Sequence, residues 1–562
     1  MSLLDKAKLV VTPTAWGQTT LYSVKPNTTD GDFDFTRNSG INRVNSSGLI
    51  EPLPYNLLKG SNNFSNDFTI SNASIASGQA DRSGGTDAWL FTKNATTAYL
   101  RQSTSSGIAA VGPQTVSIYA KAGTLDFLFI KPNASSADGA YFNLSSGTVG
   151  TVGAFVVRTA ITAAGNGYYR CEVELNKRIS QIRLSLADVD GGDSNGNTGN
   201  IYIQDCQLVK GSSARTYYET TNRRAYPVIS YANNAGHLQF TGSRTNFFRY
   251  SDSLITNWSA TGTNPPTFTE KQFTSPDGRV NASRLEFPST ATASAYSQTF
   301  QHLNNYRFAI TCYVKSNTGS NQTFRLFGDD ASVSAISSVF TATSEWQRFE
   351  FLFTATSTAT KAAGIYHDAG SASDLQVFGA QLERGSTSTN FSASPYIPAA
   401  NNYVSRSADN CYGAGIGASG IFNDSEGVLY AEVATDHENS FRVIAISDGS
   451  TNNCVRIQFT TTENQVLANI RAATATSMNA AHTLTDASAY NKIAISYKEN
   501  DFKFYVNGTQ VGTDTSGTTP TGLNQVSFGN FNNSNPFIGR CKMLAVFDEQ
   551  LTTDELECLT TP

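Results

Sequence analysis

The segment RTNFFRYSDSLITNW, Arg244–Trp258, is the key to the fold, because a second version of it occurs earlier in the chain. The earlier version is NLLKGSNNFSNDF, Asn56–Phe68, in which Asn56 corresponds to Asn246 at an offset of 190 positions. One such echo is weak evidence in a chain this rich in Ser, Thr and Asn. A duplication predicts further pairs of similar segments in the same order.

Three further pairs of segments do follow in that order, and their offsets drift among 194, 178 and 174 positions. The pairs are VSIYAK (116–121) with ITCYVK (310–315), GYYRCEVEL (167–175) with EWQRFEFLF (345–353), and QLVKG (207–211) with QLERG (381–385). Insertions in loops between fixed strands produce such drift. Four blocks in register predict a duplicated domain of about 160 residues, longer than the roughly 20–50 residues of a solenoid repeat.

The VSIYAK and ITCYVK segments alternate apolar and polar residues, which is the pattern of a half-buried strand. The residues on the apolar side are Val116, Ile118, Ala120, Ile310, Cys312 and Val314. Turns rich in Gly, Asn, Ser and Asp separate many short strands, as in a sandwich or barrel. Two antiparallel sheets packed face to face satisfy this pattern, so we predict jelly rolls at 56–220 (the first repeat) and 244–398 (the second repeat).

The rest of the chain divides into three parts. Residues 1–55 are broken by Pro and Gly and are interpreted as an anchor or adaptor segment, with a flexible leader as the alternative. Residues 221–243 carry two short apolar runs and are interpreted as a linker. Residues 399–562 hold a series of strand candidates, a hairpin signal at Asn507-Gly508 and a terminal helix with Thr552 or Thr553 as N-cap. The predicted fold class is all-β and multidomain, with two jelly rolls and a third, C-terminal β-sandwich.

Composition excludes several classes of function. Charged residues make up 15% of the 562 and the net charge is −5, so no basic surface favours nucleic acid. The apolar runs fall short of the ~18 residues of a membrane span, and the N-terminus is too short and too charged for a signal peptide. The seven cysteines form no CxxC pair. We predict that they are mostly reduced and buried, which suits assembly in a cytoplasm.

Catalytic motifs are missing from the sequence. Cleavage of a glycan needs two carboxylates that face each other across the bond. The available pairs, Glu172 with Glu174 and Glu345 with Glu350, lie in strand patterns beside apolar residues. The five histidines are dispersed, and there is no HExxH, GxSxG or Gly-rich phosphate loop. We therefore predict that the protein is not an enzyme.

One loop has a composition that suits calcium. DVDGGDSNGN at 188–197 places Asp188, Asp190 and Asp193 on a Gly-rich loop, and calcium prefers oxygen ligands at alternate positions. The spacing departs from an EF-hand, because Gly192 stands where the third acidic ligand belongs and no Glu closes the loop. The second repeat has only two aspartates at the corresponding place. Two interpretations therefore stay open, a calcium site and a polar hairpin loop, and no other cofactor is predicted.

Tryptophans are candidate platforms for sugar, because the CH face of a sugar packs on an aromatic ring. Trp258 aligns with Phe68, and Trp346 aligns with Tyr168. An aromatic residue in both copies is explained more simply by a core position. Trp89 has no aromatic counterpart in the second repeat. We name Trp89 first, and Trp258 second, as candidate ligand-binding residues.

Several segments resemble parts of bacteriophage structural proteins. RRAYPVISY (223–231) with FTGSRTNFFRYSDSL (240–254), and VFGAQLERGSTSTNFSASPYIP (377–398), are similar to the opening and closing strands of carbohydrate-binding-module-like domains in phage tail and fibre proteins. GDFDFTRNSGINRVNSSGLIE (31–51) resembles a segment that precedes such domains. VSRSADNCYGAG (404–415), FYVNGTQVGTDTSGTTPTGLNQVSFGNF (504–531) and MLAVFDEQLTTDELECLTT (543–561) resemble the C-terminal concanavalin/laminin-G-like lectin domain of the same proteins.

This resemblance implies a virion fibre, tail or head-appendage protein, assembled in the host bacterial cytoplasm and usually trimeric. Residues 1–55 would attach it to other virion proteins, the jelly rolls would extend it, and the C-terminal domain would bind bacterial surface glycan. Many weak sites would gain avidity from multivalent display. Asn507 and Asp501 become ligand candidates by family analogy alone. The first repeat departs from the family pattern at Lys59-Gly60-Ser61, which favours the second repeat as the ligand-binding copy.

Two rival functions stay open at this stage. The chain could be a structural decoration or adaptor protein of the virion, and large apolar patches on sheet faces would favour that role. A glycan depolymerase is the third reading and would need paired carboxylates in a groove. Solvent-exposed aromatic clusters would favour the lectin function.

Overall fold

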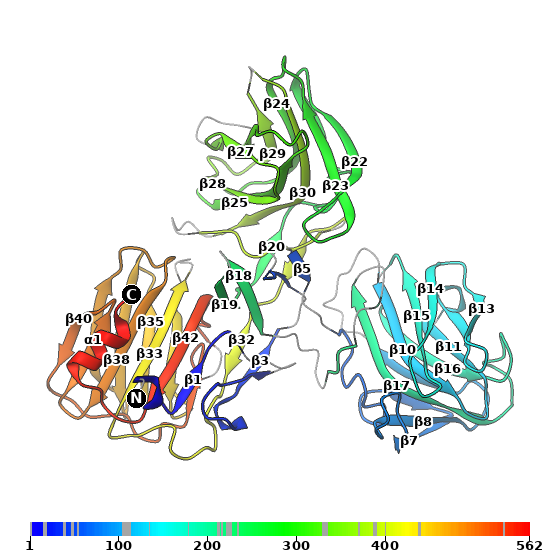
Figure 1. Ribbon diagram of the computed structural model, residues 1–562, viewed down its shortest axis with the longest axis horizontal. Helices are drawn as coiled ribbons and strands as arrows, with labels where there is room; N and C mark the ends of the chain where they lie inside the picture. The colour runs from blue at the N-terminus through cyan, green and yellow to red at the C-terminus, as the bar shows by residue number, and fades with distance from the viewer. Residues whose placement is uncertain are drawn as a thin grey trace. The chain divides into compact units, whose positions relative to one another are not determined.

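The computed structural model (Figure 1) describes residues 3–14, 20–37, 41–46, 50–52, 56–103, 114–133, 135–177, 179–210, 214, 217–220, 227–232, 235–328, 335–368, 371–385, 391–399, 401–435, 440–531 and 534–562. The chain separates into two compact units, Pro54–Ala225 and Met1–Leu53 with Tyr226–Pro562. We call them the first-repeat unit and the main unit. The protein is a multidomain β-sandwich, which confirms the predicted fold class.

The first repeat is a sandwich of two antiparallel sheets. In spatial order, one sheet consists of β14 (Val156–Ala163), β15 (Tyr169–Leu175), β10 (Gln114–Ala122), β17 (Gly199–Lys210), β8 (Ala88–Lys93) and β7 (Ala73–Gln79). The other consists of β13 (Thr148–Val152), β12 (Ala140–Asn143), β11 (Phe127–Pro132), β16 (Gln181–Ala187), β9 (Tyr99–Ser103) and β6 (Thr69–Ser71). Val116, Ile118 and Ala120 of β10 all point into the shared core, as their alternation predicts.

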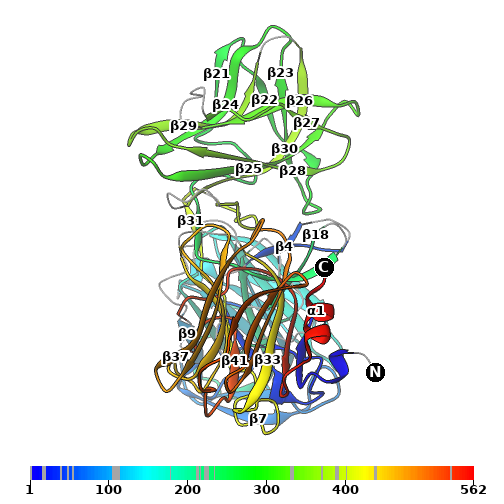
Figure 2. The same ribbon diagram turned by 90° about the vertical axis from the view of Figure 1, so that its left-hand side faces the viewer.

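The second repeat has the same architecture. One sheet consists of β21 (Ser259–Thr263), β24 (Thr292–Gln301), β29 (Thr360–His367), β26 (Gln322–Phe327) and β27 (Phe340–Ala342). The other consists of β22 (Thr267–Thr274), β23 (Val280–Phe287), β30 (Ser373–Arg384), β25 (Arg307–Ser316) and β28 (Gln347–Thr354). Figure 2 shows the two sheets facing each other. Ile310, Cys312 and Val314 lie in the core between them, again as predicted.

One buried asparagine organises the same hydrogen bonds in each repeat. Its Oδ1 accepts from two backbone N–H groups and its Nδ2 donates to two carbonyls, so a single side chain ties the start of each repeat to its last strand. The partners are Leu58, Leu208, Cys206 and Tyr218 for Asn56, and Phe248, Leu382, Ala380 and Ile397 for Asn246. Buried backbone groups must be paired in this way, because an unpaired one is costly.

Two further features occur at corresponding positions in both repeats. A serine hydroxyl meets a tyrosine hydroxyl, and the residue before the serine has a positive φ. The corresponding sets are Ser61 with Tyr217 (2.7 Å) after Gly60 (φ 44°), and Ser251 with Tyr396 (2.8 Å) after Tyr250 (φ 51°). The echo between 56–68 and 244–258 is therefore one backbone frame built twice.

The C-terminal domain pairs a long sheet with a shorter one. The long sheet consists of β18 (Val228–Ala232), β19 (Ala235–Phe240), β42 (Gly539–Phe547), β33 (Glu426–Thr435), β38 (Asn491–Lys498), β39 (Phe502–Val506) and β40 (Thr509–Asp514), and β1 (Leu9–Val11) also pairs with β42. The shorter sheet consists of β37 (Ala475–Thr483), β36 (Gln465–Ala472), β35 (Cys454–Phe459), β34 (Arg442–Ser447) and β41 (Gln525–Ser527). Asn507-Gly508 forms the predicted tight turn between β39 and β40, with φ of 48° and 83°.

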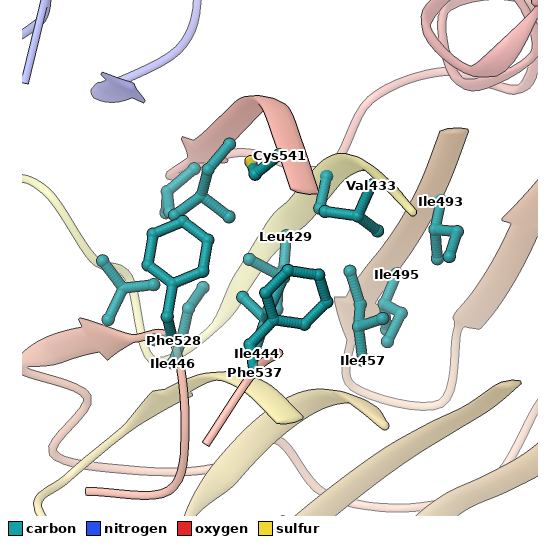
Figure 3. Packing of buried hydrophobic residues seen from close by; sticks show 14 of the residues in the cluster. Leu429, Val433, Ile444, Ile446, Ile457, Ile493, Ile495, Phe528, Phe537 and Cys541 are labelled. Atoms are coloured by element: carbon teal, nitrogen blue, oxygen red, sulfur yellow. The ribbon is translucent and has the colours of Figure 1, made fainter. Parts of the chain in front are cut away.

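The core of this domain lies between its two sheets (Figure 3). Leu429 and Val433 of β33 face Ile444 and Ile446 of β34, and all four are fully buried. Each such side chain contributes roughly 1.5–3 kcal/mol through removal of apolar surface from water. Burial of this kind is the main force that holds the sandwich together.

Segments from outside 399–562 complete the C-terminal domain. Residues 228–240, within the predicted linker, form the β18–β19 hairpin, and β19 pairs with β42. The reason is that Leu238 and Phe240 alternate like a strand and enter the core. The N-terminal part supplies β1, and its Phe33 and Phe35 are also in this core. A small sheet of β2 (Thr20–Leu21), β3 (Phe33–Thr36) and β32 (Asn410–Tyr412) joins the N-terminal part to residues 410–412. Two other small sheets consist of β20 (Arg244–Asn246) with β31 (Val404–Arg406), and of β4 (Asn42–Val44) with β5 (Ile50–Pro52).

Helix is scarce in the described part of the chain, where α1 (Thr553–Thr560) is the only α-helix. Thr552 caps it and forms a capping box with Glu555, so the predicted N-cap is confirmed. Short 3-10 turns are η1 (Leu3–Asp5), η2 (Thr29–Gly31) and η3 (Ser136–Asp138). All seven cysteines are free thiols, and all except Cys558 are buried, as the sequence predicts.

Candidate functional site

A cavity of about 470 Å³ lies inside the main unit. Its walls come from four places: the β4–β5 segment, the β18–β19 hairpin, strands β25 and β28 with residues 392–396, and residues 538–540 at the start of β42. This volume falls within the roughly 300–1,000 Å³ of ordinary small-ligand pockets. The cavity is therefore large enough for one or two sugar rings.

Aromatic rings form one wall of the cavity. Trp346, Tyr313 and Tyr396 line it and pack in one cluster with Phe378 and Ile50. The Trp346 ring is half-buried, and its Nε1–H donates to the Thr274 carbonyl at 3.2 Å. That hydrogen bond holds the edge of the indole ring in place. A fixed, half-buried indole is the kind of surface on which the CH face of a sugar packs.

A β-bulge in the second repeat makes room for these rings. The register between β25 and β30 shifts between Thr311 and Tyr313, and Gly379 on β30 adopts a left-handed φ of 65°. A Cβ at position 379 would lie 3.1 Å from Tyr313 Cδ2 and 3.4 Å from Tyr396 Cζ. Bulges of this kind re-aim neighbouring side chains. Glycine therefore suits both the backbone and the packing here.

The two tyrosines remain neutral phenols. The Tyr396 hydroxyl donates to the Asp252 carboxylate and contacts Ser251 Oγ at 2.8 Å. Burial, together with the nearby Asp252 charge, raises the pKa of Tyr396 well above its ordinary value. Burial also raises the pKa of Tyr313, although Arg348 opposes that shift. Both rings keep their apolar faces at any physiological pH.

The segment from β4 to β5 closes the cavity by joining the second repeat to the hairpin. Asn42 Nδ2 donates to the Tyr396 carbonyl at 3.2 Å, and the Ile50 N–H donates to the Pro276 carbonyl at 3.0 Å. On the other side, an Arg43 Nη1–H donates to the Ile229 carbonyl of β18 at 3.2 Å. This part of the N-terminal segment thus builds a wall of the site.

Polar groups complete the lining. Four arginines line the cavity, Arg43, Arg244, Arg348 and Arg540, and Glu350 is the one carboxylate among the lining residues of the described chain. Gln239 and His237 add amide and imidazole groups from β19. Guanidinium and amide donors beside an aromatic wall can bond the hydroxyl oxygens of a sugar while its ring packs on the indole. The arrangement suits binding of a polyhydroxylated ligand.

The two tryptophans that the sequence favoured lie elsewhere. Trp258 is 9% exposed, stacks 5.7 Å from Tyr296 and donates to the Arg249 carbonyl at 3.0 Å. Trp89 packs against the core of the first repeat, with its Nε1–H on the Asn62 carbonyl at 2.9 Å. Neither lines the cavity. Their assignment to a sugar platform gains nothing from this geometry and stays a prediction.

Asn507 and Asp501 are at opposite ends of β39. The Asn507 side-chain amide accepts from the Lys492 N–H and donates to Asn491 Oδ1, both at 2.9 Å. The Asp501 carboxylate accepts from Lys503 Nζ at 3.0 Å. Each side chain has a structural partner, and the structure does not bring the two together. Their ligand role also stays a prediction.

The three loop aspartates turn to separate neighbours. Asp188 accepts from the side-chain amides of Asn195 and Asn197, Asp190 accepts from the Thr151 N–H and hydroxyl, and Asp193 accepts from the Tyr141 hydroxyl at 2.6 Å. Among the residues that the structure describes, no three His, Cys, Asp or Glu side chains are gathered to hold a metal ion. The hydrogen bonds are those of a polar hairpin loop, and calcium at this loop stays a prediction.

The carboxylates that were weighed for catalysis do not face each other across a groove. Glu172 and Glu174 lie two apart on β15 and both bond Arg158, at 2.7 and 3.3 Å. Glu350 borders the cavity and accepts from the Ala393 N–H at 2.8 Å, whereas Glu345 precedes β28 and does not line the cavity. This geometry gives no paired acid and base around the cavity.

Sequence reasoning missed Trp346 and Arg348. Trp346 was set aside because Tyr168 stands at the same place in the first repeat, and the structure shows why that inference fails. Tyr168 is 1% exposed and bonds the Ala80 carbonyl, whereas the larger Trp346 makes the equivalent bond and stays half-exposed. The change from tyrosine to tryptophan between the two copies was the available signal.

One family model matches the chain. Residues 418–557 match the model described as the Concanavalin A-like lectin/glucanases superfamily. The C-terminal part is a concanavalin A-like domain. The match leaves out β1 and the β18–β19 hairpin, which the structure adds to the domain's long sheet. No sequence among curated proteins matches the chain.

Solved structures give only distant similarities. The Ruminococcus gnavus IT-sialidase CBM40 is 18% identical, with 25% of this chain and 84% of that one covered and a TM-score of 0.22. The CBM22-1 xylan-binding domain from Paenibacillus barcinonensis Xyn10C is 14% identical, with 26% and 96% covered and a TM-score of 0.20. The LG4-5 domains of the mouse laminin alpha1 chain are 9% identical, with 58% and 96% covered and a TM-score of 0.19. TM-scores this low do not establish a shared fold.

No helix in the described part of the chain has the length and apolar character needed to cross a bilayer.

Proposed function

We propose that the chain binds carbohydrate of a bacterial cell surface as a fibre or appendage of a bacteriophage virion, and that the cavity beside Trp346 holds the sugar. The observation that carries this proposal is the combination of a fixed, half-buried indole with guanidinium and amide donors in one cavity. The concanavalin A-like domain supports a lectin function. The virion context rests on the resemblance of 31–51, 223–254, 377–398 and the C-terminal segments to phage proteins.

The proposed activity is binding without cleavage. Glu350 lines the cavity without a second lining carboxylate among the described residues, and hydrolysis of a glycan needs two. A single weak site is sufficient for adsorption if several copies of the chain act together, because a second contact then becomes intramolecular. Homotrimeric assembly and attachment to other virion proteins belong to the same proposal.

Binding of the full chain to a glycan array tests the proposal. Residues 399–562 alone lack β1, β18 and β19, so that fragment would leave a sheet incomplete. Trp346→Ala should lower the affinity for the bound glycan about tenfold, the equivalent of ~1.4 kcal/mol, because a stacked ring is lost. Phe155→Ala is the matched control, since Phe155 is an aromatic residue of the first repeat with 60% exposure.

Three outcomes matter for this proposal. Binding that Trp346→Ala weakens and Phe155→Ala leaves unchanged supports the cavity as the site. Binding that neither change alters moves the sugar to another surface. A folded, correctly assembled chain that binds no glycan contradicts the function itself.

A structural role is the second candidate, and one observation favours it. Val152, Phe155 and Val157 are 44–60% exposed on and between the edge strands β13 and β14 of the first repeat. Exposed apolar residues at sheet edges are typical of protein contacts. If this role is correct, the array shows no binding, and Phe155→Asp with Val157→Asp reduces incorporation of the chain into particles.

A further inference from the structure

Charge is distributed unevenly between the cavity and the rest of the molecule. The chain has a net charge of −5, yet the lining includes four arginines and one glutamate. Arg43 is neutralised by its ion pair with Glu51. The excess positive charge therefore depends on the arginines whose partners are neutral.

Arg348 is the first of these. One Nη2–H donates to Thr311 Oγ1 at 3.0 Å and another to the Ser394 carbonyl at 2.8 Å, and both acceptors are uncharged. At the matching place of the first repeat, Arg170 lies 3.8 Å from the Glu172 carboxylate. Glu350 stands where Glu172 does, but its carboxylate accepts from the Ala393 N–H and makes no such pair with Arg348. The second repeat keeps the arginine without the ion pair of the first.

Arg540 is the second. It lies near the start of β42, donates from Nη2 to the Ser488 carbonyl at 2.6 Å and lies 5.3 Å from the centre of the Tyr490 ring. Both contacts orient the guanidinium through uncharged groups, and the charge of Arg540 also helps to lower the pKa of the nearby Asp486. Arg348 and Arg540 thus both border one partly enclosed space, where a guanidinium attracts an anion.

We infer that the cavity takes an acidic glycan, whose sugars carry carboxylate or phosphate groups. This inference rests on the proposed function and names the class of sugar. The sugar ring packs on Trp346 while its anionic group lies between Arg348 and Arg540. Guanidinium groups suit both kinds of anion because they donate two parallel N–H bonds.

A binding experiment on the full chain distinguishes the possibilities. The probes are oligosaccharides that contain uronic or sialic acid, each beside its carboxyl-reduced form, together with poly(glycerol phosphate) and neutral oligosaccharides. We expect at least one acidic probe to bind tenfold or more tightly than its reduced or neutral counterpart. Its affinity should fall several-fold between low and high salt, since partly exposed charges are screened. The carboxylate and phosphate arms separate the two sources of negative charge.

Variants test the two arginines. Arg348→Gln and Arg540→Gln should each weaken binding of the acidic probe about tenfold, and Arg348→Lys should retain part of the affinity because it keeps the charge. Arg170→Gln in the first repeat is the matched control and should change nothing. Thermal unfolding of each variant verifies that it is folded.

Two results would overturn the inference, and they differ in what they leave standing. Equal affinity for acidic and reduced probes, unaffected by the arginine variants, removes the acidic class while the glycan-binding function stands. No binding to any probe, acidic or neutral, contradicts the proposed function as well.

Discussion

The two repeats share a frame and differ in what covers one tyrosine. Tyr119 and Tyr313 occupy the same position on matching strands, beside a bulge that follows the same register shift. In the first repeat the bulge residue is Asp205, which has a φ of 58°. Its carboxylate accepts a hydrogen bond from Arg82 at 3.1 Å. The Arg82 guanidinium lies 4.3 Å from the centre of the Tyr119 ring. In the second repeat the bulge residue is Gly379.

This difference shows how a duplicated domain acquires separate roles. The asparagine frame is a requirement of folding, so both copies have it. The bulge residue is free to change because Asp, Asn and Gly all tolerate a positive φ. With Asp205 at the bulge, an ion pair from the same domain covers Tyr119. With Gly379 at the bulge, Tyr313 borders a cavity.

The largest effect, on the free energy of unfolding, is expected from substitution of the buried asparagine in each repeat. Asn246→Ala leaves two N–H groups and two carbonyls without their partner, each at roughly 1–3 kcal/mol when buried, so the second repeat should lose about 3–5 kcal/mol of unfolding free energy. Asn56→Ala should do the same to the first repeat alone. Calorimetry of the full chain measures both changes. A loss below about 1 kcal/mol for either variant would show that the frame is not what closes the sandwiches.

A smaller effect is expected from exchanging the bulge residues. Gly379→Asp places a side chain 3.1–3.4 Å from Tyr313 and Tyr396, so a ring must move and glycan affinity should fall about tenfold, or ~1.4 kcal/mol. Asp205→Gly removes the Arg82 pair in the first repeat and should leave affinity unchanged. Titration of the bound glycan with both variants gives the comparison. Equal behaviour of the two exchanges would mean that the bulge does not separate the repeats in function.

The smallest effect concerns acid. Burial alone would raise the pKa of Asp374, but hydrogen bonds from Arg284 and Asn317 lower it below its ordinary value of 3.8. The ionised carboxylate therefore stabilises the second repeat above pH 3.8, and that contribution is lost as the pH falls through the lowered pKa. The first repeat has Asn200 at the matching position.

Unfolding measured between pH 5 and about 2 tests this difference. Asp374→Asn should flatten the acid dependence of the second repeat and leave the first repeat unchanged. A variant whose acid dependence equals that of the wild type would exclude Asp374 as the titrating group.

Local patterns predicted the local structure well. The alternation of 116–120 and 310–314, the turn at Asn507-Gly508 and the cap at Thr552 each depend on a few neighbouring residues, and each is found as predicted. The repeat itself was visible because frame residues such as Asn246 cannot change freely. Buried hydrogen bonds of that kind require the same residue type in both repeats, and this makes the repeat detectable in the sequence.

Long-range assembly could not be predicted in the same way. The hairpin at 228–240 pairs with β42, about 300 positions away, and nothing within the hairpin specifies that partner. The cavity combines four distant segments, so no single stretch carries its pattern. Trp346 looked like a core residue because its aligned partner is one. Trp346 and Tyr168 differ in how their neighbours pack around each ring, and the sequence alignment does not contain that information.

A crystal structure of the full chain with the glycan that binds best on the array would locate the sugar. We expect a sugar ring against Trp346, with its polar or anionic groups toward Arg348 and Arg540. A sugar bound instead at the hairpin of Asn507, or on the outer face of the first repeat, with the cavity beside Trp346 empty, would contradict it.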